Sequence, residues 1–108
     1  MQRFFEALTA LSETIEARRG ADPASSWTAR LLADPALCAK KVGEEAVETA
    51  LPAVQHDPEK LAHESADLIY HWMVLLAGAG VPLAEVAAQL EARQARSGIE
   101  EKRARLSE

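Results

Sequence analysis

Two Asp-Pro pairs, Asp34-Pro35 and Asp57-Pro58, constrain the fold of this chain more than any other feature of its sequence. Aspartate is a favoured N-cap, and proline fits the first position of a helix because its missing N–H is not needed there. Each pair therefore predicts the start of a helix. The second helix is predicted to end at Gly80, since glycine commonly follows the last helical residue. Together the two segments predict a helix–loop–helix hairpin.

The remaining segments are also predicted to be helical. Apolar spacing predicts a helix over residues 2–18, and a shorter one over 27–33 with Ser25 or Ser26 as its N-cap. Pro82 starts a further helix, and residues 97–100 fit a capping box that opens a terminal helical segment. Aromatic residues make up only 5% of the chain, which disfavours a sheet. We expect an all-α bundle of four or five helices forming a single domain over residues 1–108.

Apolar positions indicate which faces of these helices are buried. After Asp57-Pro58, the residues at helical spacing are Leu61, Ser65, Leu68, Trp72, Leu75 and Ala79. In the helix after Pro82, the expected buried side is Leu83, Val86, Ala87 and Leu90. Pro52 predicts a kink or an end in the preceding helix, because its ring clashes with the carbonyl of Glu48. Cys38, the single cysteine, is expected to be a buried structural thiol.

Charge and hydropathy exclude several classes of function. With a net charge of −5, the chain as a whole lacks the excess of basic residues that attracts nucleic acid. Residues 93–105 nevertheless hold five basic side chains against two acidic ones, which suits a small phosphorylated ligand or a solvated C-terminal helix. The first residues do not resemble a signal peptide, and no apolar run is long enough to cross a bilayer. We expect a soluble, cytoplasmic protein that binds neither nucleic acid nor membrane.

Four carboxylates, arranged as two pairs, give the main indication of chemistry. Glu45 and Glu48 are three residues apart in the first hairpin helix, and Glu64 and Asp67 are three apart in the second. Like charges at this spacing share one helical face and repel each other. A divalent cation would reverse that repulsion, and all-oxygen ligands favour Mg²⁺ or Mn²⁺ over iron, zinc or copper. The alternative is that these acids form solvated helix faces neutralised by lysines.

Lys40 and Lys41 lie one turn before Glu44 and Glu45. They are at the right spacing for helical ion pairs, and either could instead reach a phosphate bound to the metal. Gly43 beside them suggests a close approach to the backbone, by a ligand or by a packed helix. Of the histidines, we expect His63 to be exposed and His71 to be a hydrogen-bonded core residue.

Four segments resemble the phosphoribosyl-ATP pyrophosphohydrolase family, which belongs to the all-α nucleoside triphosphate pyrophosphatases. They are S-W-T-A-R-L-L (26–32), K-K-V-G-E-E-A-V-E-T-A-L (40–51), E-S-A-D-L-I-Y-H-W-M-V-L-L (64–76) and S-G-I-E-E-K-R-A-R (97–105). The paired acids are shared by the wider superfamily, whereas the last segment narrows the resemblance to the histidine-biosynthesis enzyme. Residues 1–25 match only loosely.

The resemblance implies hydrolysis of phosphoribosyl-ATP to phosphoribosyl-AMP and pyrophosphate, the second step of histidine biosynthesis, by a homodimer whose helices complete each site. It implies that Mg²⁺, or Mn²⁺ as a substitute, is held by Glu45, Glu48, Glu64 and Asp67. Glu44 would be a further ligand or, like Glu45, take part in catalysis. The implied substrate-binding residues are Lys40, Lys41, Arg93, Ser97, Lys102 and Arg105.

This chain departs from the family pattern at Trp27, Pro52 and Gln94, which affects details of substrate contact and helix geometry. Two other functions stay open on the sequence alone. A pyrophosphatase of noncanonical nucleoside triphosphates would use the same acids without needing the basic C-terminal segment. A non-catalytic helical interaction module would carry the acids only as surface charge.

Overall fold

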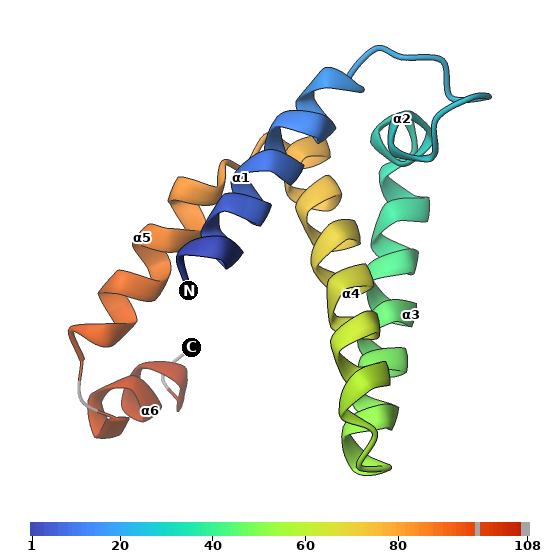
Figure 1. The fold of residues 1–108 in the computed structure, drawn as a ribbon. Helices are drawn as coiled ribbons and strands as arrows, with labels where there is room; N and C mark the ends of the chain where they lie inside the picture. Colours follow the sequence, from blue (N-terminus) through green and yellow to red (C-terminus); the bar gives the residue numbers. More distant parts are fainter. Residues whose placement is uncertain (97, 107–108) are drawn as a thin grey trace.

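A computed structural model describes residues 1–96 and 98–106, and these residues form helices without any strand (Figure 1). The helices are α1 (Gln2–Ala17), α2 (Trp27–Ala33), α3 (Pro35–Val54), α4 (Pro58–Ala79), α5 (Leu83–Gln94) and α6 (Gly98–Leu106). The all-α prediction is confirmed, although there are six described helices rather than four or five. Ser97 of the predicted capping box lies outside the described residues.

Side-chain caps fix the starts of the central helices as the sequence predicts. The Asp34 carboxylate accepts a hydrogen bond from the Leu37 amide at 3.1 Å, and Asp57 accepts one from the Lys60 amide at 3.1 Å. Ser26, one of the two predicted caps of α2, accepts from the Ala29 amide. Each bond satisfies an amide that has no partner within its own helix.

Pro52 does not end α3, which continues to Val54. A proline removes one hydrogen bond to the preceding turn, so the loss is small when the helix ends shortly afterwards. The Pro52 side chain is itself buried. Of the two predictions for this residue, an end is therefore wrong by two residues, since the hairpin turn begins at Gln55, and a kink stays a prediction.

The antiparallel α3–α4 hairpin is the main structural unit, and α2 packs against its upper end in Figure 1. The cluster of buried residues at the core consists of Ile15, Leu31, Cys38, Met73 and Val74. Leu8 and Leu11 of α1 pack against this cluster. Arg19 joins α1 to the end of α4, because its guanidinium donates to the Ala77 carbonyl at 3.0 Å and pairs with Glu16 at 2.8 Å.

Cys38 is buried as predicted, with 1% of its surface exposed. Its thiol donates a hydrogen bond to the His71 carbonyl across the hairpin, at an Sγ–O distance of 3.6 Å. Burial raises the pKa of the Cys38 thiol because the thiolate loses hydration. Both features fit a structural cysteine rather than a nucleophile.

The predictions of which residues of α4 and α5 are buried are partly wrong for the single chain. Ala87 and Leu90 of α5 are exposed, whereas Leu83 and Val86 are half-buried. In α4, the best-buried positions are His71, Met73 and Val74. The predicted stripe is instead half-buried over most of its length, with Ala79 exposed. The reason is that α1 and α5 diverge from the hairpin and leave helical faces without a neighbour (Figure 1).

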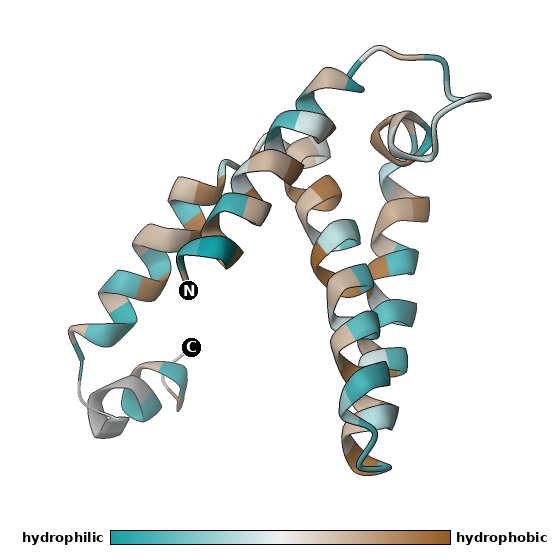
Figure 2. Cartoon of the chain, in the orientation of Figure 1, coloured by the Kyte–Doolittle hydropathy of each residue, from teal (hydrophilic) through white to brown (hydrophobic). Residues whose placement is uncertain are grey.

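The molecule is consequently more extended than a compact domain. Its radius of gyration is 16.2 Å, compared with about 13 Å expected for a compact chain of roughly this length. Large apolar side chains remain exposed, including Phe5, Val47, Leu51, Val54 and Leu90. Figure 2 shows hydrophobic ribbon, in brown, at the end of the hairpin where α3 meets α4.

In the described part of the chain, no helix by itself has the length and apolar character to span a bilayer. Only α4 and α5 taken together meet that criterion, and the two helices are bent by 109° relative to each other.

Candidate metal and substrate site

Acidic side chains from α3 and α4 meet between the two helices of the hairpin. Ligand oxygens of Glu45, Glu48 and Glu64 all lie within 4.8 Å of one another. Glu45 and Glu48 share one face of α3, while Glu64 reaches them from α4. The structure thus brings together three of the four predicted metal-ligating residues, from two facing helices. Such convergence is a common way to build a metal site in helical proteins.

Two carboxylate oxygens of this cluster are buried without a hydrogen-bond partner among the described residues: Oε2 of Glu45 and Oε2 of Glu64. Glu45 is only 6% exposed. An unpaired buried carboxylate oxygen is costly, and three acids this close also repel each other. A divalent cation among the three would remove both costs, so the residues fit a hard metal ion. These acidic groups could therefore hold a metal.

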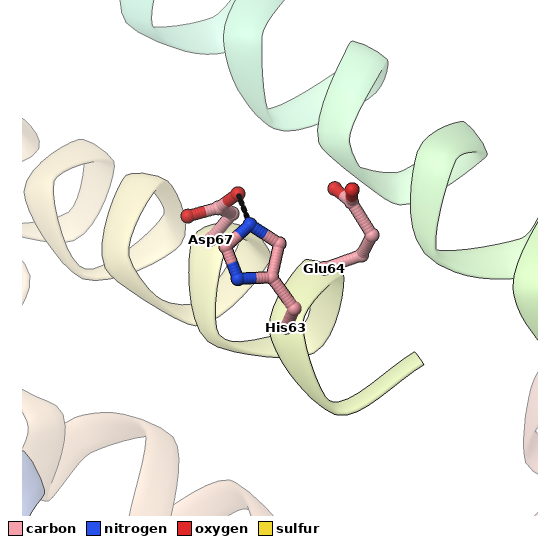
Figure 3. Close-up of side chains that lie close together, drawn as sticks. All are labelled: His63, Glu64 and Asp67. Atoms are coloured by element: carbon pink, nitrogen blue, oxygen red, sulfur yellow. Dashed lines mark ion pairs between the residues drawn. The ribbon is translucent and has the colours of Figure 1, made fainter. Parts of the chain in front are cut away.

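Asp67 belongs to a second group that overlaps the first. His63, Glu64 and Asp67 offer ligand atoms within 4.8 Å of one another. His63 is exposed as predicted, and its Nε2 lies 3.6 Å from Asp67 Oδ2. Figure 3 shows His63 paired with Asp67 along α4, while the Glu64 carboxylate extends toward α3. Glu64 is thus shared by both groups, and the contact between His63 and Asp67 was not foreseen from the sequence.

The lysines of α3 form the helical ion pairs that their spacing predicts. Lys40 Nζ lies 3.9 Å from Glu44, and Lys41 Nζ lies 3.6 Å from Glu45. Lys41 also donates to Glu44 at 3.3 Å. This hydrogen bond, with the charges of Glu44 and Glu45, raises the pKa of Lys41. Apart from the adjoining residues and the backbone of α3 itself, no described atom lies within 4 Å of where a Cβ on Gly43 would stand, so packing against another helix of the chain does not explain this glycine.

His71 supports the backbone of the acidic region from inside the hairpin. It is 7% exposed, which confirms the prediction of a hydrogen-bonded core histidine. Its Nδ1 lies 2.8 Å from the Asp67 carbonyl, so Nδ1 carries the proton and donates. Its Nε2 then accepts from the indole N–H of Trp27 at 3.3 Å. Trp27, one of the departures from the family pattern, therefore helps to fix the neutral tautomer of His71.

A cavity of about 180 Å³ adjoins the acidic cluster at its side nearest the hairpin turn. It is lined by Glu48, Leu51, Pro52, Gln55, Lys60 and Glu64. Sequence reasoning missed Gln55 and Lys60, because neither belongs to a recognisable motif. Their position becomes visible only when the turn brings the start of α4 beside the end of α3.

The basic residues near the C-terminus are not brought to the acids within the single chain. Arg93 lies on α5, and Lys102 and Arg105 lie on α6, all exposed. In Figure 1, α6 lies well away from the α3–α4 hairpin. Ser97, predicted to bind the same substrate groups, lies outside the described residues. Their role in substrate binding stays a prediction.

Comparison with known proteins connects this geometry to a family. The sequence pattern of a family described as phosphoribosyl-ATP pyrophosphohydrolase matches residues 8–94. A phosphoribosyl-ATP pyrophosphatase from Caulobacter sp. (strain K31) is 58% identical over 107 residues, 99% of this chain and 100% of the relative. Proteins of the same name from Caulobacter vibrioides (strain NA1000 / CB15N) and Cereibacter sphaeroides (strain ATCC 17029 / ATH 2.4.9) are each 58% identical, over 96% and 91% of this chain and 97% and 96% of the relatives. The chain belongs to the phosphoribosyl-ATP pyrophosphohydrolase family.

Proposed function

We propose that this chain hydrolyses phosphoribosyl-ATP to phosphoribosyl-AMP and pyrophosphate in a Mg²⁺-dependent reaction, the second step of histidine biosynthesis in the cytoplasm. Membership of the family supports phosphoribosyl-ATP as the substrate. The observation that carries the chemistry is the convergence of Glu45, Glu48 and Glu64, two of which hold a buried oxygen without a partner. A phosphoanhydride is the kind of substrate for which a metal–carboxylate site is useful.

Glu45, Glu48 and Glu64 would hold the metal. Asp67 would be a further ligand, because it lies near Glu64 in the second group of possible ligands. Their donor atoms are all oxygen, which suits Mg²⁺ and allows Mn²⁺. When bound, such an ion polarises the phosphoryl group, neutralises the leaving pyrophosphate and lowers the pKa of a coordinated water. The protein's own contribution is to position the triphosphate and compensate its charge.

Lys41 and Glu44 are placed to act at the edge of this cluster. In the free chain Lys41 is paired with Glu44 and Glu45. A bound triphosphate would compete for the ammonium group, and release of Glu44 would leave a half-exposed carboxylate beside the cluster to orient or deprotonate water. Lys40 is more exposed and would neutralise outer phosphate oxygens. Arg93, Ser97, Lys102 and Arg105 are proposed to bind the phosphoribosyl end of the substrate.

The proposed active form is a homodimer. The single chain leaves the basic residues of α5 and α6 away from the acids, and it exposes apolar side chains on α3 and α5. A second copy packed on these faces would bury the apolar surface and could bring one chain's basic segment to the other's hairpin.

Pyrophosphate release by the purified chain, measured with and without Mg²⁺, tests this function. We expect turnover of phosphoribosyl-ATP and not of free nucleoside triphosphates. Glu45→Gln keeps the side-chain shape but removes the charge, and should lower turnover by about 100-fold or more. Glu13→Gln, an equivalent change on the exposed face of α1, is the control and should leave turnover unchanged. Hydrolysis of free nucleotides alone would assign the chain to nucleotide house-cleaning instead.

A further inference from the structure

Thr49 connects the backbones of two of the clustered acids across the hairpin. Its hydroxyl oxygen lies 2.7 Å from the carbonyl oxygen of Glu45, one turn earlier on α3. The same oxygen lies 3.1 Å from the carbonyl oxygen of Glu64 on α4. A threonine hydroxyl has a single proton, so it is shared between the two carbonyl acceptors. Thr49 is half-buried, which protects this shared bond from water.

The two threonines of α1 provide a comparison for this arrangement. Thr9 and Thr14 of α1 each donate to the carbonyl four residues earlier, both at 3.0 Å. That local bond is common for threonine in a helix. Thr49 makes it too, but adds an acceptor fifteen residues away on a different helix. The second acceptor ties α3 to α4 at this level.

The two residues that Thr49 connects are the ones with unpartnered buried oxygens. Within the part of the chain that the structure describes, Oε2 of Glu45 and Oε2 of Glu64 both lack a hydrogen-bond partner. In this partly buried cluster, the mutual repulsion of Glu45, Glu48 and Glu64 pushes α3 and α4 apart. A hydrogen bond between the helices at the same level opposes that separation. The bond thus acts on the spacing between the helices at the level from which the carboxylates of Glu45 and Glu64 extend.

We propose that Thr49 is a positioning residue for the metal site: its hydroxyl holds α3 and α4 at the spacing that lets Glu45 and Glu64 bind one cation together. This inference rests on the proposed metal-dependent function. Small hard cations tolerate little variation in ligand distance, Mg²⁺ least of all. Residues that orient metal ligands without touching the metal typically change affinity by about 10- to 100-fold when they are replaced.

Mn²⁺ binding to the full chain, followed by electron paramagnetic resonance of the free ion, tests the proposal without substrate. Thr49→Val keeps the branched shape and removes the hydroxyl, and should weaken the Mn²⁺ affinity about 10-fold or more. Thr49→Ser restores the donor and should bind nearly as well as the unsubstituted chain. Thr14→Val removes only a local bond at an exposed position of α1, and should leave the affinity unchanged.

Thr49→Ala provides a second variant without the hydroxyl, with circular dichroism recording the helix content of each protein. If the unsubstituted chain binds no Mn²⁺, the metal site of the proposed function is wrong, and the role of Thr49 falls with it. If that chain binds Mn²⁺ but Thr49→Val and Thr49→Ala bind equally well, only the positioning role is overturned. Equal weakening by Thr49→Ser, or loss of helix in both variants without the hydroxyl, would also overturn it, since shape or folding would then be the cause.

Discussion

His56 ends the first half of the hairpin in a left-handed backbone conformation, with φ of 57°. Its amide donates to the Ala53 carbonyl at 3.3 Å, and the Asp57 amide donates to the Pro52 carbonyl at 2.9 Å. This pair of bonds is the Schellman arrangement, which favours glycine at the left-handed position. The end of α4 has the same two bonds, but there Gly80 takes the left-handed position with φ of 73°.

Replacing His56 with glycine should therefore stabilise the chain. The left-handed conformation costs a residue with a Cβ about 1–2 kcal/mol, whereas glycine costs about 0.5–1 kcal/mol through its freedom in the unfolded chain. We expect His56→Gly to raise the free energy of unfolding by about 0.5–1 kcal/mol, measured by urea denaturation at fixed protein concentration. Gly80→Ala is the matched control and should destabilise. A lower denaturation midpoint for His56→Gly would contradict the prediction.

At the scale of helices, the starts of α3 and α4 and the end of α4 at Gly80 were predictable because their signals are local. The Asp34 and Asp57 caps depend on residues within one turn, and they form as the sequence indicates. Burial was harder to predict, because it depends on which helix lies opposite. Leu90 has the right spacing for a core residue and is still 57% exposed.

The candidate site shows the same division between local and long-range information. The spacing of Glu45 and Glu48 on α3 was enough to predict their shared face, and Glu64 on α4 joins them. Thr49 gave no signal in the sequence, because its bond to the Glu64 carbonyl crosses between helices. The pairing of His63 with Asp67 was likewise missed, although their i,i+4 spacing could have indicated it.

Removing the C-terminal helix should separate metal binding from substrate binding. A chain that ends at Gln94 lacks α6 with its exposed Lys102 and Arg105, but keeps all the clustered acids on α3 and α4. We expect it to bind Mn²⁺ as the full chain does and to lose phosphoribosyl-ATP turnover, because the substrate loses the basic partners that α6 contributes. Lys102→Gln with Arg105→Gln in the full chain is the control for effects of truncation itself. Undiminished turnover in both proteins would exclude the basic segment from substrate binding.

At the scale of the whole molecule, the main feature is apolar surface that the single chain leaves uncovered. Val47, Leu51 and Val54 recur at helical spacing along α3, and they are 61%, 53% and 77% exposed. Leu51 also lines the cavity beside Glu48 and Glu64. The uncovered stripe therefore borders the acidic cluster, and a partner seated on it would help to enclose the substrate.

We expect the chain of 11.7 kDa to sediment as a dimer in analytical ultracentrifugation at micromolar concentration. Val47→Glu combined with Val54→Glu places charge on the stripe, away from the residues that line the cavity, and should shift the protein to the monomer. Burying an unpaired charge costs more free energy than the apolar contact that it replaces contributes. Val47→Ile combined with Val54→Ile preserves the apolar character and should remain dimeric. Because the acids of each hairpin come from one chain, the monomeric variant should still bind Mn²⁺ while its turnover of phosphoribosyl-ATP falls. A dimer that survives the glutamates would place the interface on another face, with the exposed side of α5 next to be tested in the same way.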